Sequence, residues 1–166
     1  MFDTTLAVGF WRNSMSERSN RMHGQNDMTE WLQKLIDRQI GKFPDYLGLE
    51  WTLAERGHIR GRLVIKPHHI APNGFLHAAV VVGLADTACG YGCLITLPEG
   101  ATGFTTVELK SNFLGTLREG AIAGESRLVH GGRTTQVWDA TVTREDNSKM
   151  LALFRCTQII LYPKTG

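Results

Sequence analysis

The sequence has 166 residues, which predicts one domain of ordinary size. Hydrophobic residues make up 42% and charged residues 20%, an ordinary globular balance that argues against an intrinsically disordered chain. The formal net charge of +2 is too small for nucleic-acid binding by bulk charge, and no apolar run reaches the ~18 residues of a membrane span. Three cysteines without a Cys-x-x-Cys motif favour a reduced, cytoplasmic protein.

The N-terminal segment has the weakest pattern in the chain. Residues 1–25 show no sustained hydrophobic period, and we interpret them as an extension of uncertain order before a folded domain over residues 26–166. Asp27 and Glu30 then have the spacing of a capping box. Five apolar residues follow at the helical period: Trp31, Leu32, Leu35, Ile36 and Ile40. We therefore predict a helix that ends at Gly41.

Two strands and a long helix are predicted next. Leu47–Glu55 and Ile59–Lys66 have strand-like patterns and are joined by a short turn. Pro67–Gly74 is a loop, because it holds two prolines and an Asn-Gly pair. Leu76–Ile95 is small or apolar almost all the way round, which is typical of a buried helix. Its glycines disfavour helix, so we expect a sheet or a second helix to approach closely there.

Four strand-like runs close the chain, separated by turn residues: Gly103–Leu114, Ala121–His130, Thr134–Thr143 and Met150–Leu161. Their short connections favour antiparallel neighbours. The element order predicts an α+β fold, in which an antiparallel sheet is wrapped around one central apolar helix.

Asp86 is the most informative residue of that helix. An unpaired carboxylate in apolar surroundings is costly or takes up a proton. Two hypotheses for the role of Asp86 follow from this position. Asp86 either pairs with a basic residue or caps a loop, or it is a general base or nucleophile in a pocket whose pKa is set by burial.

His77 lies at the expected N-terminus of the same helix. The free N–H groups of Ala78 and Ala79 point outward at such an end and can polarise a carbonyl, while His77 itself can serve simply as a cap. From His77 to Asp86 the helix rises about 13.5 Å. Either one of these two groups is structural, or a two-fold dimer with antiparallel central helices shares the site.

Three motifs resemble a known family. The run Asn73–Ala79, followed by Gly83–Ala88, resembles hot-dog-fold thioesterases of the phenylacetate-degradation (PaaI-like) type, which show Asn-x-x-Gly-x-x-His-Gly-Gly and then Leu-Ala-Asp-Thr-Ala. Thr105–Leu114 resembles the family's third strand, and His130–Thr134 resembles its strand-connecting loop. The resemblance covers roughly Leu47 to Leu161 and implies the hot-dog fold.

The resemblance also implies roles for matching residues. Asp86 matches the acidic residue that activates water or attacks the thioester carbonyl, and the N–H groups after His77 match the donors that polarise it. Thr106 matches a Ser/Thr that helps to place the water. The loop near the phosphates of coenzyme A is matched by Gly132, Arg133 and Thr134.

The chain departs from the family pattern at two points. The Gly-Gly after the histidine is Ala78-Ala79 here, which keeps the N–H groups and adds two methyl groups where a ligand approaches. The position of the family asparagine is held by Ala71. Asn73 either takes over that catalytic role or simply makes the Asn-Gly turn.

The sequence therefore predicts a homodimer or homotetramer that hydrolyses acyl- or aroyl-CoA thioesters. We expect no cofactor beyond the coenzyme A of the substrate, and no nucleic-acid or membrane partner. We expect no metal, because Cys89 and Cys93 lack the convergent ligands of a zinc site. The alternatives are an acyl-CoA hydratase or dehydratase on the same fold and a non-catalytic acyl-CoA-binding module.

Overall fold

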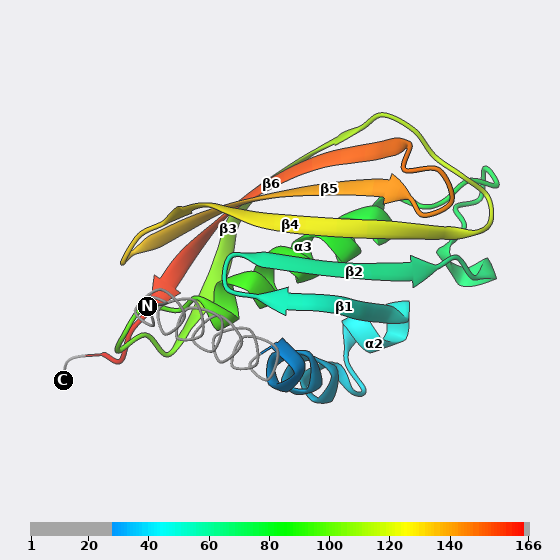
Figure 1. Cartoon of the computed structure of the whole chain (residues 1–166). Coiled ribbons are helices and arrows are strands. Elements are labelled where there is room, and N and C mark those ends of the chain that lie inside the picture. Colours follow the sequence, from blue (N-terminus) through cyan, green and yellow to red (C-terminus); the bar gives the residue numbers. More distant parts are fainter. Residues whose placement is uncertain (1–27, 165–166) are drawn as a thin grey trace, which may run out of the picture.

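The computed structural model describes residues 28–164, so the predicted extension and Asp27 of the predicted capping box lie outside the described part. One six-stranded antiparallel sheet, in the order β1-β2-β4-β5-β6-β3, curves around the helix α3 (Ala78–Ile95) (Figure 1). The strands are β1 (Leu49–Glu55), β2 (His58–Val64), β3 (Gly103–Phe113), β4 (Ala121–Gly131), β5 (Thr135–Arg144) and β6 (Met150–Leu161). This arrangement confirms the predicted α+β hot-dog fold.

Two short helices were not predicted. The helix α2 (Phe43–Leu47) has only five residues, too few to show a hydrophobic period. It ends at Gly48, whose φ of 71° is the left-handed conformation that glycine adopts at low cost. The predicted first strand began at Leu47, which is the last residue of α2. The 3-10 helix η1 (Pro67–His69) lies within the predicted loop.

The N-terminal helix, over residues 28–39, packs with only part of the predicted face, because Trp31 and Leu32 lie against the core as predicted. Leu35 is fully buried, but Ile36 and Ile40 are exposed. Gln39 takes the inner position instead, and its Oε1 accepts a hydrogen bond of 2.7 Å from Trp51 Nε1 on β1. A buried amide is favourable only with such partners, which a hydrophobic period does not reveal.

The helix α3 lies against the concave face of the sheet because its glycines have no side chain. A Cβ atom at Gly92 would collide with the ring of Trp138 on β5, and one at Gly83 would lie 2.6 Å from Leu47 Cδ1. This confirms the expected close approach. The length and hydropathy of α3 reach those of a membrane span, but most of the helix is buried beneath the sheet, as in the core helix of a globular domain.

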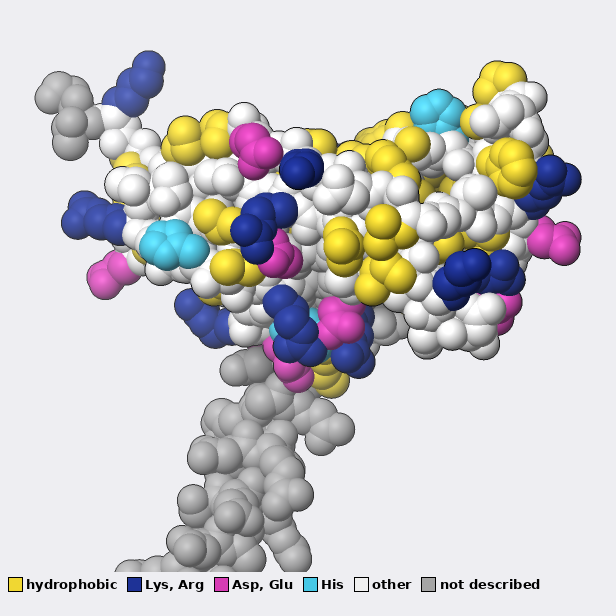
Figure 2. Space-filling model, turned by 90° about the horizontal axis from the view of Figure 1, so that it is seen from above, with side chains coloured by type: hydrophobic (Ala, Val, Ile, Leu, Met, Phe, Trp, Pro, Cys, Tyr) yellow, Lys and Arg dark blue, Asp and Glu magenta, His cyan; other side chains and the backbone are white. Residues whose placement is uncertain are grey.

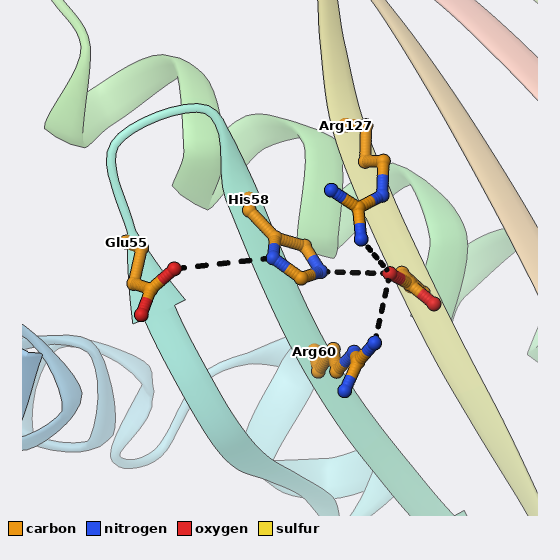
Figure 3. Close-up of polar contacts among 5 residues, drawn as sticks. Glu55, His58, Arg60 and Arg127 are labelled. Atoms are coloured by element: carbon orange, nitrogen blue, oxygen red, sulfur yellow. Dashed lines mark hydrogen bonds and ion pairs between the residues drawn. The ribbon is translucent and has the colours of Figure 1, made fainter.

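The outer face of the sheet carries charged side chains among apolar ones (Figure 2). On β4, Glu125 accepts hydrogen bonds from His58 Nε2 at 2.8 Å, Arg60 at 3.1 Å and Arg127 at 2.7 Å (Figure 3). Glu55 reaches the other nitrogen of the His58 ring at 4.0 Å. We call these five residues the outer cluster. Its charges compensate one another at the surface, away from α3.

Candidate active site

Asp86 lies in the middle of α3 and is partly buried. Its Oδ1 atom is buried and has no hydrogen-bond partner, and no basic side chain pairs with Asp86 within residues 28–164. Burial raises the pKa of the Asp86 carboxyl, and the hydroxyl of Thr106 beside it acts in the opposite direction. A carboxyl group left without a compensating cation is unfavourable for folding, and carboxyl groups with such raised pKa values cluster at functional sites.

Thr106 reaches Asp86 from β3, the edge strand of the sheet. It lies opposite Gln158 of β6, and the register then shifts by one residue at Val107 before Glu108 pairs with Thr157. This bulge keeps Thr106 on the inner face while Glu108 stays on the outer face. Bulges of this kind often re-aim side chains beside active sites.

A row of polar side chains crosses the inner face of the sheet from Thr106. Thr106 Oγ1 donates a hydrogen bond of 2.9 Å to Gln158 Oε1, and Gln158 is fully buried. On the neighbouring strand, the buried Gln136 exchanges hydrogen bonds with Thr96 at the end of α3. Sequence reasoning missed both glutamines. The available signal was a glutamine at an inward-facing position of a strand whose other inward-facing positions are mostly apolar.

The N-terminus of α3 offers fewer free donors than predicted. His77 is the N-cap, and its Nδ1 accepts a hydrogen bond of 3.0 Å from the N–H of Ala79. Since Nδ1 is an acceptor, the neutral ring carries its proton on Nε2. Within the described residues, the Ala78 N–H has no hydrogen-bond partner. Of the two predicted backbone donors, the Ala79 N–H is therefore used by the His77 cap, and the Ala78 N–H is left without a partner among the described residues.

Asn73 makes the turn that precedes this helix. Its Oδ1 accepts a hydrogen bond of 3.2 Å from the N–H of Phe75, and Gly74 between them has a φ of 81°. This is an Asx turn, the simpler of the two roles considered for Asn73. The guanidinium of Arg118 lies 4.5 Å from the centre of the Phe75 ring, so the turn is also packed against the β3–β4 connection.

A cleft of about 730 Å³ opens at the C-terminal end of α3, lined in part by Arg56, Leu97, Glu99, Gly132 and Arg133. Two of the three residues predicted to lie near coenzyme A, Gly132 and Arg133, line this cleft, and Thr134 does not. Tyr162 holds the loop in place, because its hydroxyl donates a hydrogen bond of 2.7 Å to the carbonyl of Arg133.

The predicted site residues lie at three places along α3 and do not meet within one chain. Asp86 is about 12 Å of helical rise from Ala78 and about 15 Å from Thr96 beside the cleft. The edge strand β3 next to Asp86 also exposes three large apolar side chains, Val107, Leu109 and Phe113. Natural monomers rarely leave such an edge uncovered.

The described residues contain no group of three His, Cys, Asp or Glu side chains arranged to hold a metal ion. Cys89, Cys93 and Cys156 are free thiols in the core. Burial raises the pKa of the Cys93 thiol to about 12, so it stays protonated and packs as a small apolar group.

A sheet wrapped around one helix, with a carboxyl group on that helix beside the edge strand, defines a hot-dog protein of the thioesterase class. The model of the thioesterase superfamily matches residues 73–151. A putative esterase of Saccharolobus solfataricus is 31% identical over 108 residues, which are 65% of this chain and 70% of that protein. This chain belongs to the thioesterase superfamily and is a thioester hydrolase.

Further proteins are similar to this chain in sequence and in structure. A 1,4-dihydroxy-2-naphthoyl-CoA hydrolase of Listeria monocytogenes is 29% identical over 67% of this chain and 89% of that protein. A mutant thioesterase of Pseudomonas aeruginosa superposes with a TM-score of 0.73 at 25% identity, over 78% of this chain and 93% of that one. The Escherichia coli PaaI protein has a TM-score of 0.68 at 18% identity, over 81% and 96% of the two chains, and so shares the fold.

Proposed function

We propose that this protein hydrolyses acyl- or aroyl-CoA thioesters to the free acid and coenzyme A, with Asp86 as the reacting carboxylate. The observation that carries this proposal is the buried Oδ1 of Asp86, which has no partner and lies beside Thr106. A relative that acts on an aromatic acyl-CoA supports aroyl thioesters as one substrate class.

The thioester carbonyl is polarised by the N-terminus of α3. The N–H of Ala78 points out at the positive end of the helix dipole, and the Nε2–H of His77 is a second donor at the same place. Thr106 helps to place the water. As water attacks the carbonyl carbon, its proton passes to Asp86; the C–S bond then breaks, and the departing thiolate takes the proton back. In the nucleophilic variant, Asp86 attacks the carbonyl carbon, the C–S bond breaks and coenzyme A leaves as the thiolate. Water then cleaves the resulting mixed anhydride to the free acid and the Asp86 carboxylate, and a proton of the water passes to the thiolate.

The two halves of this site come from different subunits of a homodimer or homotetramer. Asp86 and Ala78 of one chain are too far apart for one carbonyl, whereas antiparallel α3 helices bring Asp86 of one chain to Ala78 of the other. Pairing of the exposed edge strands β3 covers their apolar side chains. The cleft with Gly132 and Arg133, together with the adjacent Thr134, receives the phosphates of coenzyme A.

The first test measures release of free thiol from a panel of acyl- and aroyl-CoA esters. We expect Asp86→Asn to lower kcat by about 10²-fold or more, the scale of a lost general base. Asp139→Asn is the matched control, because it removes a carboxylate that pairs with Arg155 on the outer face. Equal turnover by wild type and Asp86→Asn refutes the role of Asp86. Binding without turnover supports the binding module, and hydration of crotonyl-CoA without thiol release supports the hydratase.

A second test asks whether the site is shared. Ala78→Pro removes the N–H of Ala78 at the first helical position, where proline is tolerated, and the extended backbone of His77 suits a following proline. Each of Ala78→Pro and Asp86→Asn alone is expected to retain only about a hundredth of the wild-type activity or less. In a mixed and reassociated sample, about a quarter of the sites combine an intact Asp86 with an intact Ala78 of the other chain. Absence of any recovered activity, with heterodimers verified, refutes the shared site.

A further inference from the structure

The Thr106 hydroxyl has one proton and two neighbouring acceptors. Gln158 Oε1 takes that proton in a hydrogen bond of 2.9 Å. The Asp86 carboxyl also lies beside Thr106, yet its buried Oδ1 has no hydrogen-bond partner. A hydroxyl can donate only one hydrogen bond, so the choice between the two acceptors fixes what Thr106 offers to the site.

We propose that Gln158 is a positioning residue: by accepting the Thr106 proton, it leaves Thr106 Oγ1 as a hydrogen-bond acceptor toward the water that Asp86 deprotonates. This inference rests on the proposed function. A carboxylate cannot donate a hydrogen bond, so the free lone pairs of Thr106 are matched by an O–H group of water. Water that donates one proton to Asp86 and the other to Thr106 keeps a lone pair for the carbonyl carbon. This arrangement favours the mechanism in which Asp86 acts as a general base over the one in which Asp86 attacks the carbonyl carbon itself.

The burial of Gln158 supports this role. Its position on β6 faces inward between Cys156 and Ile160, where an apolar residue would avoid the cost of burying an amide. The amide of Gln158 has two bonds within the described residues: Oε1 accepts from Thr106, and Nε2 lies 3.4 Å from Cys156 Sγ, a weak acceptor. The strong bond is therefore the one to Thr106, on the side of Asp86.

The proposal also explains the state of Asp86. A Thr106 hydroxyl turned toward Asp86 lowers the pKa of that carboxyl. With the Thr106 proton bonded to Gln158, the lowering by Thr106 stays smaller than the effect of burial, and the pKa of Asp86 is raised. Asp86 is left as a stronger base on a side chain that is only partly buried.

The decisive experiment compares kcat, KM and the acidic limb of the kcat–pH profile on benzoyl-CoA for wild type, Thr106→Val and Gln158→Met. Gln158→Met frees the Thr106 proton for Asp86, so the limb moves to lower pH and kcat falls about tenfold, with KM little changed. Thr106→Val lowers kcat but leaves the limb in place. Gln158→Glu keeps an acceptor oxygen and retains more activity than Gln158→Met.

The control for a purely structural role is Gln136→Met. Gln136 is equally buried on the adjacent strand but bonds Thr96, so this variant is expected to lose stability without moving the limb. A limb that moves to higher pH in Thr106→Val, or stays in place in Gln158→Met, overturns the proposal. Because Thr106 is exposed, the Thr106→Val test holds even if Gln158→Met does not fold. Full activity of Asp86→Asn would instead refute the proposed mechanism itself.

Discussion

Asp86 and Glu125 are two carboxyl groups on opposite sides of one sheet, and their environments shift their pKa values in opposite directions. At Asp86, burial raises the pKa and only Thr106 opposes it. At Glu125, burial by itself also raises the pKa, but hydrogen bonds from Arg60, Arg127 and His58 outweigh it and the pKa is lowered. The inner carboxyl therefore binds a proton more readily than a free aspartate does, while the outer one is held as a fixed charge.

The difference lies in the partners rather than in the residue type. The outer cluster supplies three N–H donors from β2 and from β4 itself, each within 3.1 Å of Glu125 (Figure 3). The surroundings of Asp86 supply a single hydroxyl that already donates to Gln158. A carboxyl group that is left without compensation in the core reduces stability, and proteins retain such groups mainly at functional sites. The predictions below test this contrast.

The largest expected effect is on the pH dependence of the rate. The base must be ionised, so kcat falls about tenfold per pH unit below the pKa of Asp86. Because the pKa is raised, this limb lies above the ordinary value of 3.8 for aspartate. Stopped assays of thiol release across the acidic range measure it, with Asp139→Asn as control. A limb at or below 3.8 contradicts the absence of a compensating partner.

The next effect is on stability. The folded state disfavours ionised Asp86, so wild type loses stability as the pH rises from the unfolded to the folded pKa. Asp86→Asn is therefore expected to be more stable than wild type at neutral pH by about 0.5–2 kcal/mol. Urea unfolding at several pH values measures this. The difference should disappear in acid, and a less stable variant at pH 7 would show that Asp86 is paired.

Glu125→Gln should act in the opposite direction. Since the folded pKa of Glu125 is lowered, its stabilisation is present above the ordinary value of 4.5 and is lost as the pH falls through the folded pKa. We expect a loss of about 0.2–1 kcal/mol at neutral pH, with unchanged kcat. Unfolding in low and high salt measures the loss, which salt should reduce. A salt-independent loss above this range would mean that Glu125 contributes through packing.

The smallest effect is expected for Arg60→Gln. This variant removes one of three donors to Glu125, and the shorter bonds from His58 and Arg127 remain. The expected loss is a few tenths of a kcal/mol or less, as for most exposed ion pairs. A double-mutant cycle with Glu125→Gln isolates the coupling energy. A coupling as large as the whole effect of Glu125→Gln would show that Arg60 dominates the outer cluster.

The sequence predicted the elements of this fold well, for local reasons. Every predicted strand is present with ends displaced by at most two residues, because turn residues and strand alternation are local signals. The N-terminal helix shows the limit of such patterns. Ile36 fits the helical period but is exposed, because contact with β1 selects a face that includes Gln39.

The sequence identified candidate site residues by their chemical type, but it did not show how they contact one another. Asp86 stood out because a carboxyl group interrupts an apolar helix, and His77 because it precedes that helix. That His77 takes up the Ala79 N–H, and that Asn73 makes its own turn, depends on side-chain rotamers that the sequence does not specify. The place of Gly132 and Arg133 in a cleft at the end of α3 required the packed sheet.

The sequence by itself determined the α+β element order, the buried character of α3 and the presence of a carboxyl group within it, because these follow from local periodicity and composition. Only the tertiary structure decided what surrounds that carboxyl. Thr106 and Gln158 are 52 residues apart, and strand pairing with a bulge brings them together beside Asp86. Which groups compensate a charge is a property of the packed state, since contacts between distant segments form only when the sheet closes around the helix.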